Sequence, residues 1–254
     1  MDDSELFARM YANLREFCRL MGGASPGARV VELAGVVAAV VPATPHRSVP
    51  NSVAYDTPED LERALPRLAE VYEEAGVNAW TVWTPEADRR AITLLADAGH
   101  RLDADPAAMS MELRHLAAPR PHDLDLDPAP SVSQMAELND AAYGTAPDMS
   151  LALRSLPGVT LHVARVDGKA ASVVGTHDHG GDACILFVAT APEAQGRGLA
   201  TRLMALALHE ARDRGAVTTS LQATKMGYPV YAKLGYRHLG ALQMWERRSL
   251  TRTE

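Results

Sequence analysis

The feature that most constrains the fold is a continuous apolar run, which a glycine-containing loop and an amphipathic helix follow directly. The run DACILFVAT covers residues 182–190, the loop APEAQGRG covers 191–198, and LATRLMALAL begins the helix. A strand that is apolar at nearly every position is typical of one buried on both faces of a sheet. Glycines between such a strand and a helix let backbone amides close on an anion, because the helix N-terminus supplies a positive dipole. This stretch predicts an α/β fold with a phosphate-binding loop.

The remaining pattern predicts two successive sets of helices and strands, which suits a chain of 254 residues. In the first half it predicts a helix over 4–20, strands over 30–41 and 49–55, a helix over 57–75, a strand over 79–84, a helix over 85–98 and a strand pair ending near 116. In the second half it predicts helices over 132–143 and 148–155, a hairpin of 161–166 with 171–178, a strand over 182–190, a helix from 198 to 215, a strand over 216–223, a short helix ending at 234–235 and two closing strands.

A segment rich in proline and aspartate, AAPRPHDLDLDPAPS at 117–131, separates the two sets and is the best linker candidate. It predicts a first domain over 1–118 and a second over 119–254. The two halves also resemble each other. ADAGHRL around Gly99 matches AKLGYRHL around Gly235, and at nearly the same offset VAYDTPEDLERAL lies against VATAPEAQGRGLATRL. We interpret the chain as a duplication of one α/β unit.

The bulk properties exclude several classes of protein. A net charge of −7 and a pI near 5.7 argue against a general nucleic-acid binder, which needs a basic face. The longest apolar stretch, Val36 to Val41, is too short to cross a bilayer, and the acidic N-terminus does not resemble a signal peptide. Two cysteines, Cys18 and Cys184, cannot build a disulfide framework, and no metal-ligand spacing is present. We expect a cytoplasmic protein with no nucleic-acid partner, no membrane association and no metal.

Two common phosphate-binding motifs do not fit the loop. The P-loop pattern GxxxxGK[ST] is absent. A dinucleotide fingerprint needs a third glycine and a carboxylate at the end of the next strand. The sequence instead reads Gly196-Arg197-Gly198-Leu199-Ala200-Thr201, and the next strand ends in Leu221-Gln222. Too little chain follows Gly198 for the rest of a doubly wound sheet.

A third pattern does fit. Gln195-Gly196-Arg197-Gly198-Leu199-Ala200 resembles the Q/R-x-x-G-x-G/A signature of the GCN5-related N-acetyltransferase (GNAT) superfamily. Downstream, VYAKLGY at 230–236 resembles the second motif of this family, LYxxLGF/Y. The resemblance covers about residues 120–250, and it reaches the first half only through the repeat. It implies an α/β (α+β) fold of two GNAT-like domains, each a mixed, mostly antiparallel twisted sheet flanked by helices.

The resemblance also implies a cofactor and a reaction. A neutral amine attacks the thioester of acetyl-CoA, a tetrahedral oxyanion forms, and the CoA thiolate leaves. Tyr231 is the implied acid that protonates the thiolate. Thr224 stands where members of the family often have asparagine. The residues implied to bind coenzyme A are Val188, Ala189, Thr190, Gln195, Gly196, Arg197, Gly198, Leu199, Ala200, Thr201 and Thr224.

The general base is left open by the sequence. His177 and His179 alternate onto one strand face, but without a further ligand they are interpreted as a solvated strand end rather than a metal pair. Glu193 opens the loop and is interpreted as a local hydrogen-bonding group. Cys184 lies inside an apolar strand, which favours a small buried residue over a nucleophile. A water relay without a single base also fits.

The first half differs at the matching positions. Where the second half has its glycine loop, the first has Asp56-Thr57-Pro58-Glu59-Asp60, whose carboxylates already satisfy the helix dipole and would repel a pyrophosphate. Leu95 stands in the place of Tyr231. We predict that the first half has lost cofactor binding and serves as a structural partner or as a wall of the substrate site.

The hypothesis from the sequence is an acyl-CoA-dependent N-acyltransferase with its active site in the second half. The expected acceptor is a small-molecule amine or a peptide amine, and the expected assembly is a monomer or a homodimer. One alternative is an amino-sugar-thiol acetyltransferase resembling mycothiol synthase. The other is a non-catalytic CoA-binding regulatory module.

Overall fold

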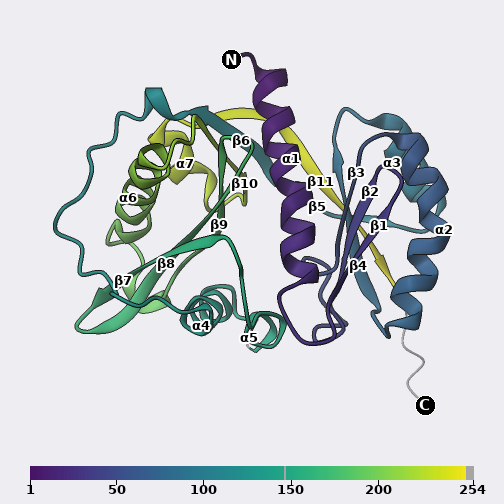
Figure 1. Ribbon diagram of the computed structural model, residues 1–254, viewed down its shortest axis with the longest axis horizontal. Helices are drawn as coiled ribbons and strands as arrows, with labels where there is room; N and C mark the ends of the chain where they lie inside the picture. The colour runs from purple at the N-terminus through teal and green to yellow at the C-terminus, as the bar shows by residue number, and fades with distance from the viewer. Residues whose placement is uncertain (146, 250–254) are drawn as a thin grey trace. The chain divides into compact units, whose positions relative to one another are not determined.

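The computed structural model describes residues 1–145 and 147–249, and their contacts divide into two compact units. The 107–239 unit joins Met1–Asn13 to Ala107–Leu239. The 14–106 unit joins Leu14–Pro106 to the chain from Gly240 onward. The first helix, α1 (Asp3–Gly22), therefore contributes its opening turns to one unit and the rest to the other. Figure 1 labels the elements of both units.

The sheet of the 14–106 unit has the strand order β1-β2-β3-β4-β11, and β5 also pairs with β11. Only the pairing of β3 with β4 is parallel, and the intervening chain forms a helix, as parallel neighbours require. The strands are β1 (Arg29–Leu33), β2 (Val36–Val40), β3 (Ser52–Tyr55), β4 (Ala79–Pro85), β5 (Arg101–Ala104) and β11 (Arg237–Arg248); the helices are α2 (Pro58–Glu74) and α3 (Arg89–Asp97).

Helix α2 covers this sheet with a stripe of apolar side chains at helical spacing. Leu61, Leu68 and Tyr72 are fully buried on the stripe and join a core with the central strands and Trp80. Such spacing places every third or fourth residue on one face, so the opposite face stays polar. The predicted strand at 79–84 and the predicted helix start at Thr57 are both confirmed.

The sheet of the 107–239 unit has the order β6-β10-β9-β8-β7. Its strands are antiparallel except β9 and β10, which are parallel and are connected through a helix. Both α4 and α6 pack on β8 and β9. The strands are β6 (Ala107–Glu112), β7 (Val159–Val166), β8 (Lys169–His179), β9 (Asp182–Thr190) and β10 (Thr218–Ala223); the helices are α4 (Val132–Tyr143), α5 (Asp148–Ala152), α6 (Leu199–Asp213) and α7 (Tyr228–Leu234).

The core of this unit forms where α6 packs on the sheet. Leu203, Met204 and Leu208 of α6 are fully buried and cluster with Ile185 of β9. The predicted strand over 182–190 and the predicted helix over 132–143 have the expected bounds. The mixed, mostly antiparallel sheets with flanking helices confirm the predicted fold class.

Two strands, β6 and β11, do not belong to the unit that their positions in the sequence suggest. β6 follows the first set of elements, yet it pairs with β10 of the 107–239 unit over its whole length. β11 follows the second set of elements, yet from Leu242 onward it pairs with β4 of the 14–106 unit. The division into two domains after residue 118 stays a prediction. The two compact units differ from that division, because β6 belongs to the 107–239 unit and most of β11 belongs to the 14–106 unit.

One predicted element is wrong. The sequence predicts two closing strands, whereas the structure has the single strand β11 of 12 residues. Gly240 within it has a φ of +106°, a conformation that only glycine adopts readily. The glycine therefore lets the strand continue through an irregular position instead of ending it.

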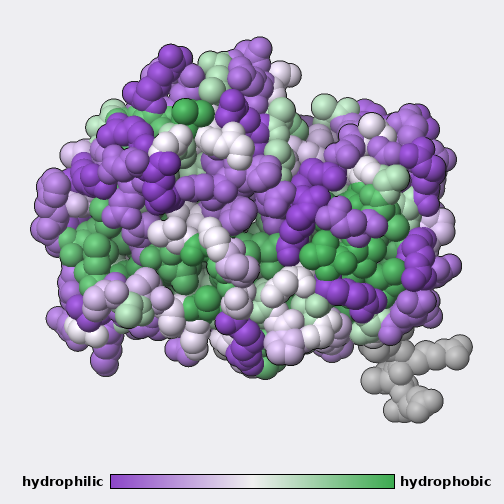
Figure 2. Space-filling model, in the orientation of Figure 1, coloured by the Kyte–Doolittle hydropathy of each residue, from purple (hydrophilic) through white to green (hydrophobic). Residues whose placement is uncertain are grey.

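The face of the molecule shown in Figure 2 is largely hydrophilic, with hydrophobic residues visible between polar ones. Large hydrophobic side chains that are exposed include Tyr143 and Met226 of the 107–239 unit. Among the described residues, no helix combines the length and apolar character needed to span a membrane.

Candidate functional site

Two neighbouring strands of the 107–239 unit separate and open a wedge. β9 and β10 pair only over residues 182–184 and 218–220, and they diverge beyond Cys184 and Ser220. Within β9, Phe187 has a φ of +53°, and the register with β8 shifts between Val173 and Gly175. A bulge of this kind bends a strand and increases its twist. The bulge therefore helps β9 to turn away from β10.

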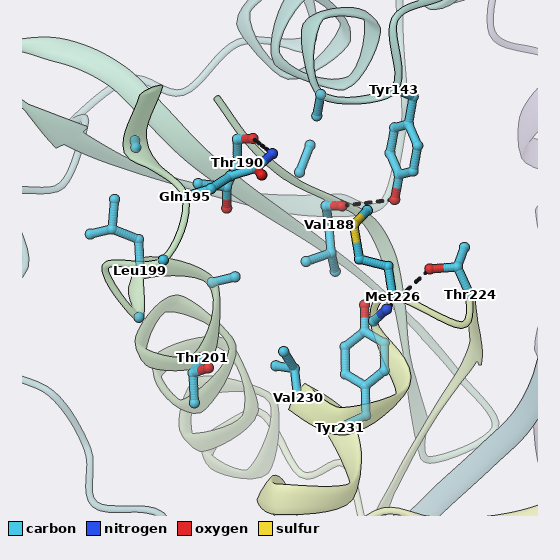
Figure 3. Close-up of a pocket in the computed structure, with 17 residues that line it drawn as sticks. Tyr143, Val188, Thr190, Gln195, Leu199, Thr201, Thr224, Met226, Val230 and Tyr231 are labelled. Atoms are coloured by element: carbon cyan, nitrogen blue, oxygen red, sulfur yellow. Dashed lines mark hydrogen bonds between the residues drawn. The ribbon is translucent and has the colours of Figure 1, made fainter. Parts of the chain in front are cut away.

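A cavity of about 340 Å³ lies in this region and is lined by most of the residues that the sequence predicts to bind a cofactor. The cavity also receives the predicted acid, Tyr231 (Figure 3). Arg197 is the exception, because it is exposed and does not line the cavity. The predicted residues that line the cavity are Val188, Ala189, Thr190, Gln195, Gly196, Gly198, Leu199, Ala200, Thr201, Thr224 and Tyr231.

The glycine loop leaves the start of α6 open. Gly196 and Gly198 have φ values of +74° and +70°, and a Cβ at either position would meet nothing within 4 Å. Gly198 is the N-cap of α6, and within the described chain no side chain caps this helix end. The first amides of a helix have no intrahelical partner, so they can donate to an anion here. Gln195 closes the base of the loop by donating its Nε2 to the Thr190 carbonyl at 3.2 Å.

Tyr231 projects from α7 into the other end of the cavity (Figure 3). Its side chain is 8% exposed, and burial raises its pKa well above the usual range, with a smaller contribution from Tyr143. A phenol is protonated at neutral pH even at its ordinary pKa of about 10, so Tyr231 has a proton to donate. Gly227 allows the ring to approach closely, since a Cβ there would lie 2.9 Å from Cε2 of Tyr231.

Thr224 lines the cavity and also shapes the entry to α7. Its Oγ1 accepts a hydrogen bond from the amide of Gly227 at 3.2 Å. Threonine can satisfy a nearby backbone amide in this way at the start of a turn. The hydroxyl thus fixes the turn that leads to Tyr231, whatever it contributes to a ligand.

Six further residues line the cavity and were not predicted from the sequence: Ala142, Tyr143, Ala194, Met226, Gly227 and Val230. The most prominent is Tyr143, whose hydroxyl donates to the Val188 carbonyl at 3.4 Å. Tyr143 ends a helix that lies 45 residues before this strand position, and no motif marks it. Met226 and Gly227 lie four and three residues before the start of the VYAKLGY motif, so their closeness to that motif in the sequence was the available signal.

A buried carboxylate organises the turn beside Tyr143. Asp140 is 2% exposed, and its Oδ1 accepts hydrogen bonds from the Met149 amide at 2.8 Å and from Thr145 Oγ1 at 3.3 Å. Its Oδ2 accepts from the amide and the hydroxyl of Ser150 at 3.0 and 2.8 Å. Asp140 therefore ties the first turn of α5 to α4, next to the residue that reaches the cavity.

The other candidates from the sequence lie outside the cavity. His177 has its Nδ1 3.4 Å from Oδ1 of Asn13, away from the lining residues. Glu193 is exposed in the loop before α6. Cys184 is buried, and burial raises the pKa of its thiol far above the usual range, so it is not a ready nucleophile. Within the described ranges, no cluster of three or more His, Cys, Asp or Glu residues suits a metal ion.

The matching helix start in the 14–106 unit is already occupied. Thr57 caps α2 by accepting a hydrogen bond from the Asp60 amide, and the Asp60 carboxylate accepts from the Thr57 hydroxyl at 2.6 Å. That carboxylate packs so closely on Gly35 that a Cβ there would lie 2.4 Å from it. Leu95, in the place of Tyr231, is fully buried. The start of α2 is thus capped by a side chain, whereas within the described chain the start of α6 is not.

The mixed sheets with flanking helices, the diverging strands and the glycine loop at the start of α6 agree with the GNAT-like fold that the sequence motifs predict. Residues 138–247 match the family model described as "Acetyltransferase (GNAT) domain", which is less than half of the chain. The chain thus contains a GNAT acetyltransferase domain in its second half, and the predicted resemblance is confirmed. None of the curated proteins compared with the chain matches it.

Solved structures extend the similarity of fold to the whole chain. A GCN5-related N-acetyltransferase from Kribbella flavida is 16% identical, with a TM-score of 0.68 over 94% of this chain and 96% of its own. A GCN5-related N-acetyltransferase from Sphaerobacter thermophilus is 18% identical, with a TM-score of 0.56 over 84% and 76%. A tandem GNAT protein from the clavulanic acid biosynthesis pathway is 16% identical, with a TM-score of 0.55 over 95% of both chains. At these identities the shared property is the fold.

Proposed function

We propose that the 107–239 unit transfers an acyl group, acetyl in the first instance, from acyl-CoA to a primary amine. One observation carries this proposal: a single cavity has the open start of α6 at one end and the protonated phenol of Tyr231 at the other. An anion cradle and a proton donor on one cavity suit a thioester whose distant end bears a pyrophosphate. The match of residues 138–247 to a GNAT domain supports the same reaction.

The glycine loop is the proposed site for the pyrophosphate of coenzyme A. Gly196 and Gly198 leave room for a phosphate group to approach the backbone closely. A Cβ at either position would occupy the open space beside the loop. The uncapped amides of Leu199, Ala200 and Thr201 add donors and the helix dipole. Arg197 is exposed and does not line the cavity, so its proposed role is to attract the pyrophosphate through its positive charge without direct contact.

The end of β9 is the proposed site for the pantetheine arm and the thioester carbonyl. Val188, Ala189 and Thr190 line the cavity on the strand that has turned away from β10. Backbone amides fixed in a bulged strand are preorganised donors for a developing oxyanion. In this proposal the strand supplies orientation as well as charge stabilisation, and no side chain is required.

Tyr231 is the proposed acid for the departing thiolate. Its phenol faces the cavity and is protonated at neutral pH, as an unperturbed phenol also is. Proton transfer to the sulfur lets it leave as the neutral thiol, and positioned general acids contribute about 10²- to 10⁴-fold to rates. The attacking nitrogen loses a proton, which restores the phenol directly or through a water relay.

The 14–106 unit is proposed to have no cofactor site. Thr57 and Asp60 satisfy the start of α2, and two carboxylates, Asp56 and Glu59, lie beside it in ion pairs with Arg15 and Arg90. A pyrophosphate there would meet negative charge without open amides. The unit therefore acts as a structural partner in this proposal.

The decisive experiment combines binding with turnover. The full chain is titrated with acetyl-CoA by calorimetry, and release of the CoA thiol is followed with a panel of amines. Saturable binding with amine-dependent thiol release supports the proposal. Binding without thiol release from any amine identifies a CoA-binding regulatory protein instead, and no binding overturns the cofactor assignment.

A further inference from the structure

The described residues that line the cavity carry no charge. Among the seventeen residues that the structure places around it, none has a charged side chain. An ammonium group that moved from the exposed end of the cavity inward to the buried Tyr231 would lose hydration without meeting a counter-ion, and such burial is costly or forces the group to lose its proton. The cavity therefore favours a nitrogen that arrives without charge.

The described residues that line the cavity include no group suited to take a proton from an ammonium ion. Both phenols that face the cavity, Tyr143 and Tyr231, are protonated near neutral pH, because the ordinary pKa of a phenol is about 10 and burial raises it further here. The other polar lining side chains are Thr190, Gln195, Thr201 and Thr224, which do not act as bases near neutral pH. Deprotonation must then precede entry, which suits amines of low basicity.

The end of the cavity away from the glycine loop is aromatic and apolar. Tyr143 and Met226 lie at this end with Tyr231, as Figure 3 shows. Tyr143 is 46% exposed and Met226 is 69% exposed, which is unusual for large hydrophobic residues that line a cavity. A thioether and a phenol ring form a polarisable pair of walls that suits an aromatic or aliphatic group.

We infer that the acceptor is a weakly basic amine, uncharged near neutral pH, on an aromatic or other apolar group that packs between Tyr143 and Met226. This inference rests on the proposed acyl transfer. The nitrogen lone pair forms the bond to the acyl carbon, the carbon–sulfur bond breaks, and the thiolate takes the proton of Tyr231. The proton that the nitrogen loses restores the phenol, directly or through water, so no external base is consumed.

The test compares acceptors that differ mainly in basicity. Acetyl transfer by the full chain is measured with 4-methylaniline, which is neutral near pH 7, with benzylamine, which has similar size and is protonated, and with agmatine, which has a cationic chain. We expect kcat/KM for 4-methylaniline to exceed that for benzylamine by about tenfold or more, corresponding to about 1.4 kcal/mol. Raising the pH should increase kcat/KM for benzylamine, because more of it is then uncharged, and should bring its kcat/KM closer to that for 4-methylaniline.

A charge introduced at the apolar end should change this preference. Met226→Glu places a carboxylate at the exposed end of the cavity, and we expect it to raise kcat/KM for agmatine and to lower that for 4-methylaniline. Met226→Gln introduces a side chain of nearly the same size without a charge, and it should not raise kcat/KM for agmatine.

Two outcomes separate the inference from the function on which it rests. If agmatine is acetylated faster than 4-methylaniline by the unmodified chain, the inference is overturned while acyl transfer stands. If the chain neither binds acetyl-CoA nor releases CoA thiol with any acceptor, the proposed function is overturned, and the inference with it.

Discussion

The ring of Tyr231 lies edge-on to the ring of Tyr236, with centroids 6.0 Å apart and an interplanar angle of 62°. Tyr236 is itself anchored, because its hydroxyl lies 2.8 Å from Oγ1 of Thr219 on β10. Edge-to-face contact of this kind is a favoured arrangement of aromatic pairs. The orientation of the phenol in the cavity is thus set by the buried core of its own unit.

Removing the Tyr231 hydroxyl should separate binding from chemistry. We expect Tyr231→Phe to lower kcat by about 10²-fold or more, because the thiolate loses its proton donor, while the Kd for acetyl-CoA stays unchanged. Stopped-flow detection of CoA thiol and calorimetry measure the two quantities. Tyr236→Phe is the matched control: it removes a buried hydroxyl that does not line the cavity, and should cost about 1 kcal/mol of stability with a smaller effect on kcat. Equal kcat for Tyr231→Phe and the unmodified chain would remove Tyr231 as the acid.

A methyl group in the glycine cradle should weaken acetyl-CoA binding. Gly198→Ala introduces a Cβ at a φ of +70°, where it meets nothing in the protein and would lie toward a bound anion. We expect the Kd to rise about tenfold or more, at a conformational cost of about 1 kcal/mol. Gly215→Ala is the control, because Gly215 follows the same helix, has a φ of +99° and also has open space at its Cβ. If both variants bind acetyl-CoA like the unmodified chain, the loop is not the pyrophosphate site.

The corresponding helix start in the 14–106 unit should not bind acetyl-CoA. Asp56 pairs with Arg15 at 2.5 Å on a partly exposed surface, so Asp56→Asn should change the free energy of unfolding by less than about 1 kcal/mol. We expect no change in the Kd for acetyl-CoA, measured by calorimetry. A weakened Kd in this variant, with stability preserved, would contradict a cofactor site confined to the 107–239 unit.

The turn that Asp140 organises should matter for the acceptor more than for the cofactor. Asp140→Ala leaves the amides of Met149 and Ser150 without their carboxylate, and we expect a loss of about 2–3 kcal/mol in unfolding free energy. Because Tyr143 ends the same helix, KM for the amine should rise while the Kd for acetyl-CoA changes little. Ser150→Ala, which removes one of the four hydrogen bonds, should show a smaller effect in the same direction. Urea unfolding and steady-state kinetics measure both, and an unchanged amine KM in Asp140→Ala would count against this role.

The sequence predicted the elements whose signals are local. The apolar run of β9, the Thr57 cap of α2 and the glycine that ends α7 were visible because each depends on neighbouring residues. The predicted helix over 85–98 begins only at Arg89, because Pro85 still belongs to β4 and Asp88 caps the helix. The predicted helix over 148–155 ends at Ala152.

What the sequence could not provide is pairing between distant segments. The pairing of β6 with β10, and that of β11 with β4, depend on which strand edges meet, and no local pattern specifies this. The same holds for the site. Tyr231 and the glycine loop belong to motifs with fixed spacing, whereas Tyr143 reaches Val188 only through the packing of α4.

A buried histidine in the 14–106 unit should make stability depend on pH. His100 is 3% exposed, packs edge-on against Trp80 with centroids 4.7 Å apart, and has no hydrogen-bond partner at either ring nitrogen within the described chain. Burial, assisted by Arg247, lowers its pKa from the usual 6.5 to about 4.

Between those two pKa values the unfolded chain binds more protons at this residue than the folded chain does. The stability that neutral His100 contributes is therefore complete above about pH 6.5, falls as the pH drops toward about 4, and is lost below. The full difference is about 3 kcal/mol. Urea unfolding of the chain and of His100→Phe across this range isolates the effect, since every other titrating group is common to both. We expect the unfolding free energy of the unmodified chain to fall more steeply with acid than that of His100→Phe; parallel curves would show that His100 is hydrated or paired when folded.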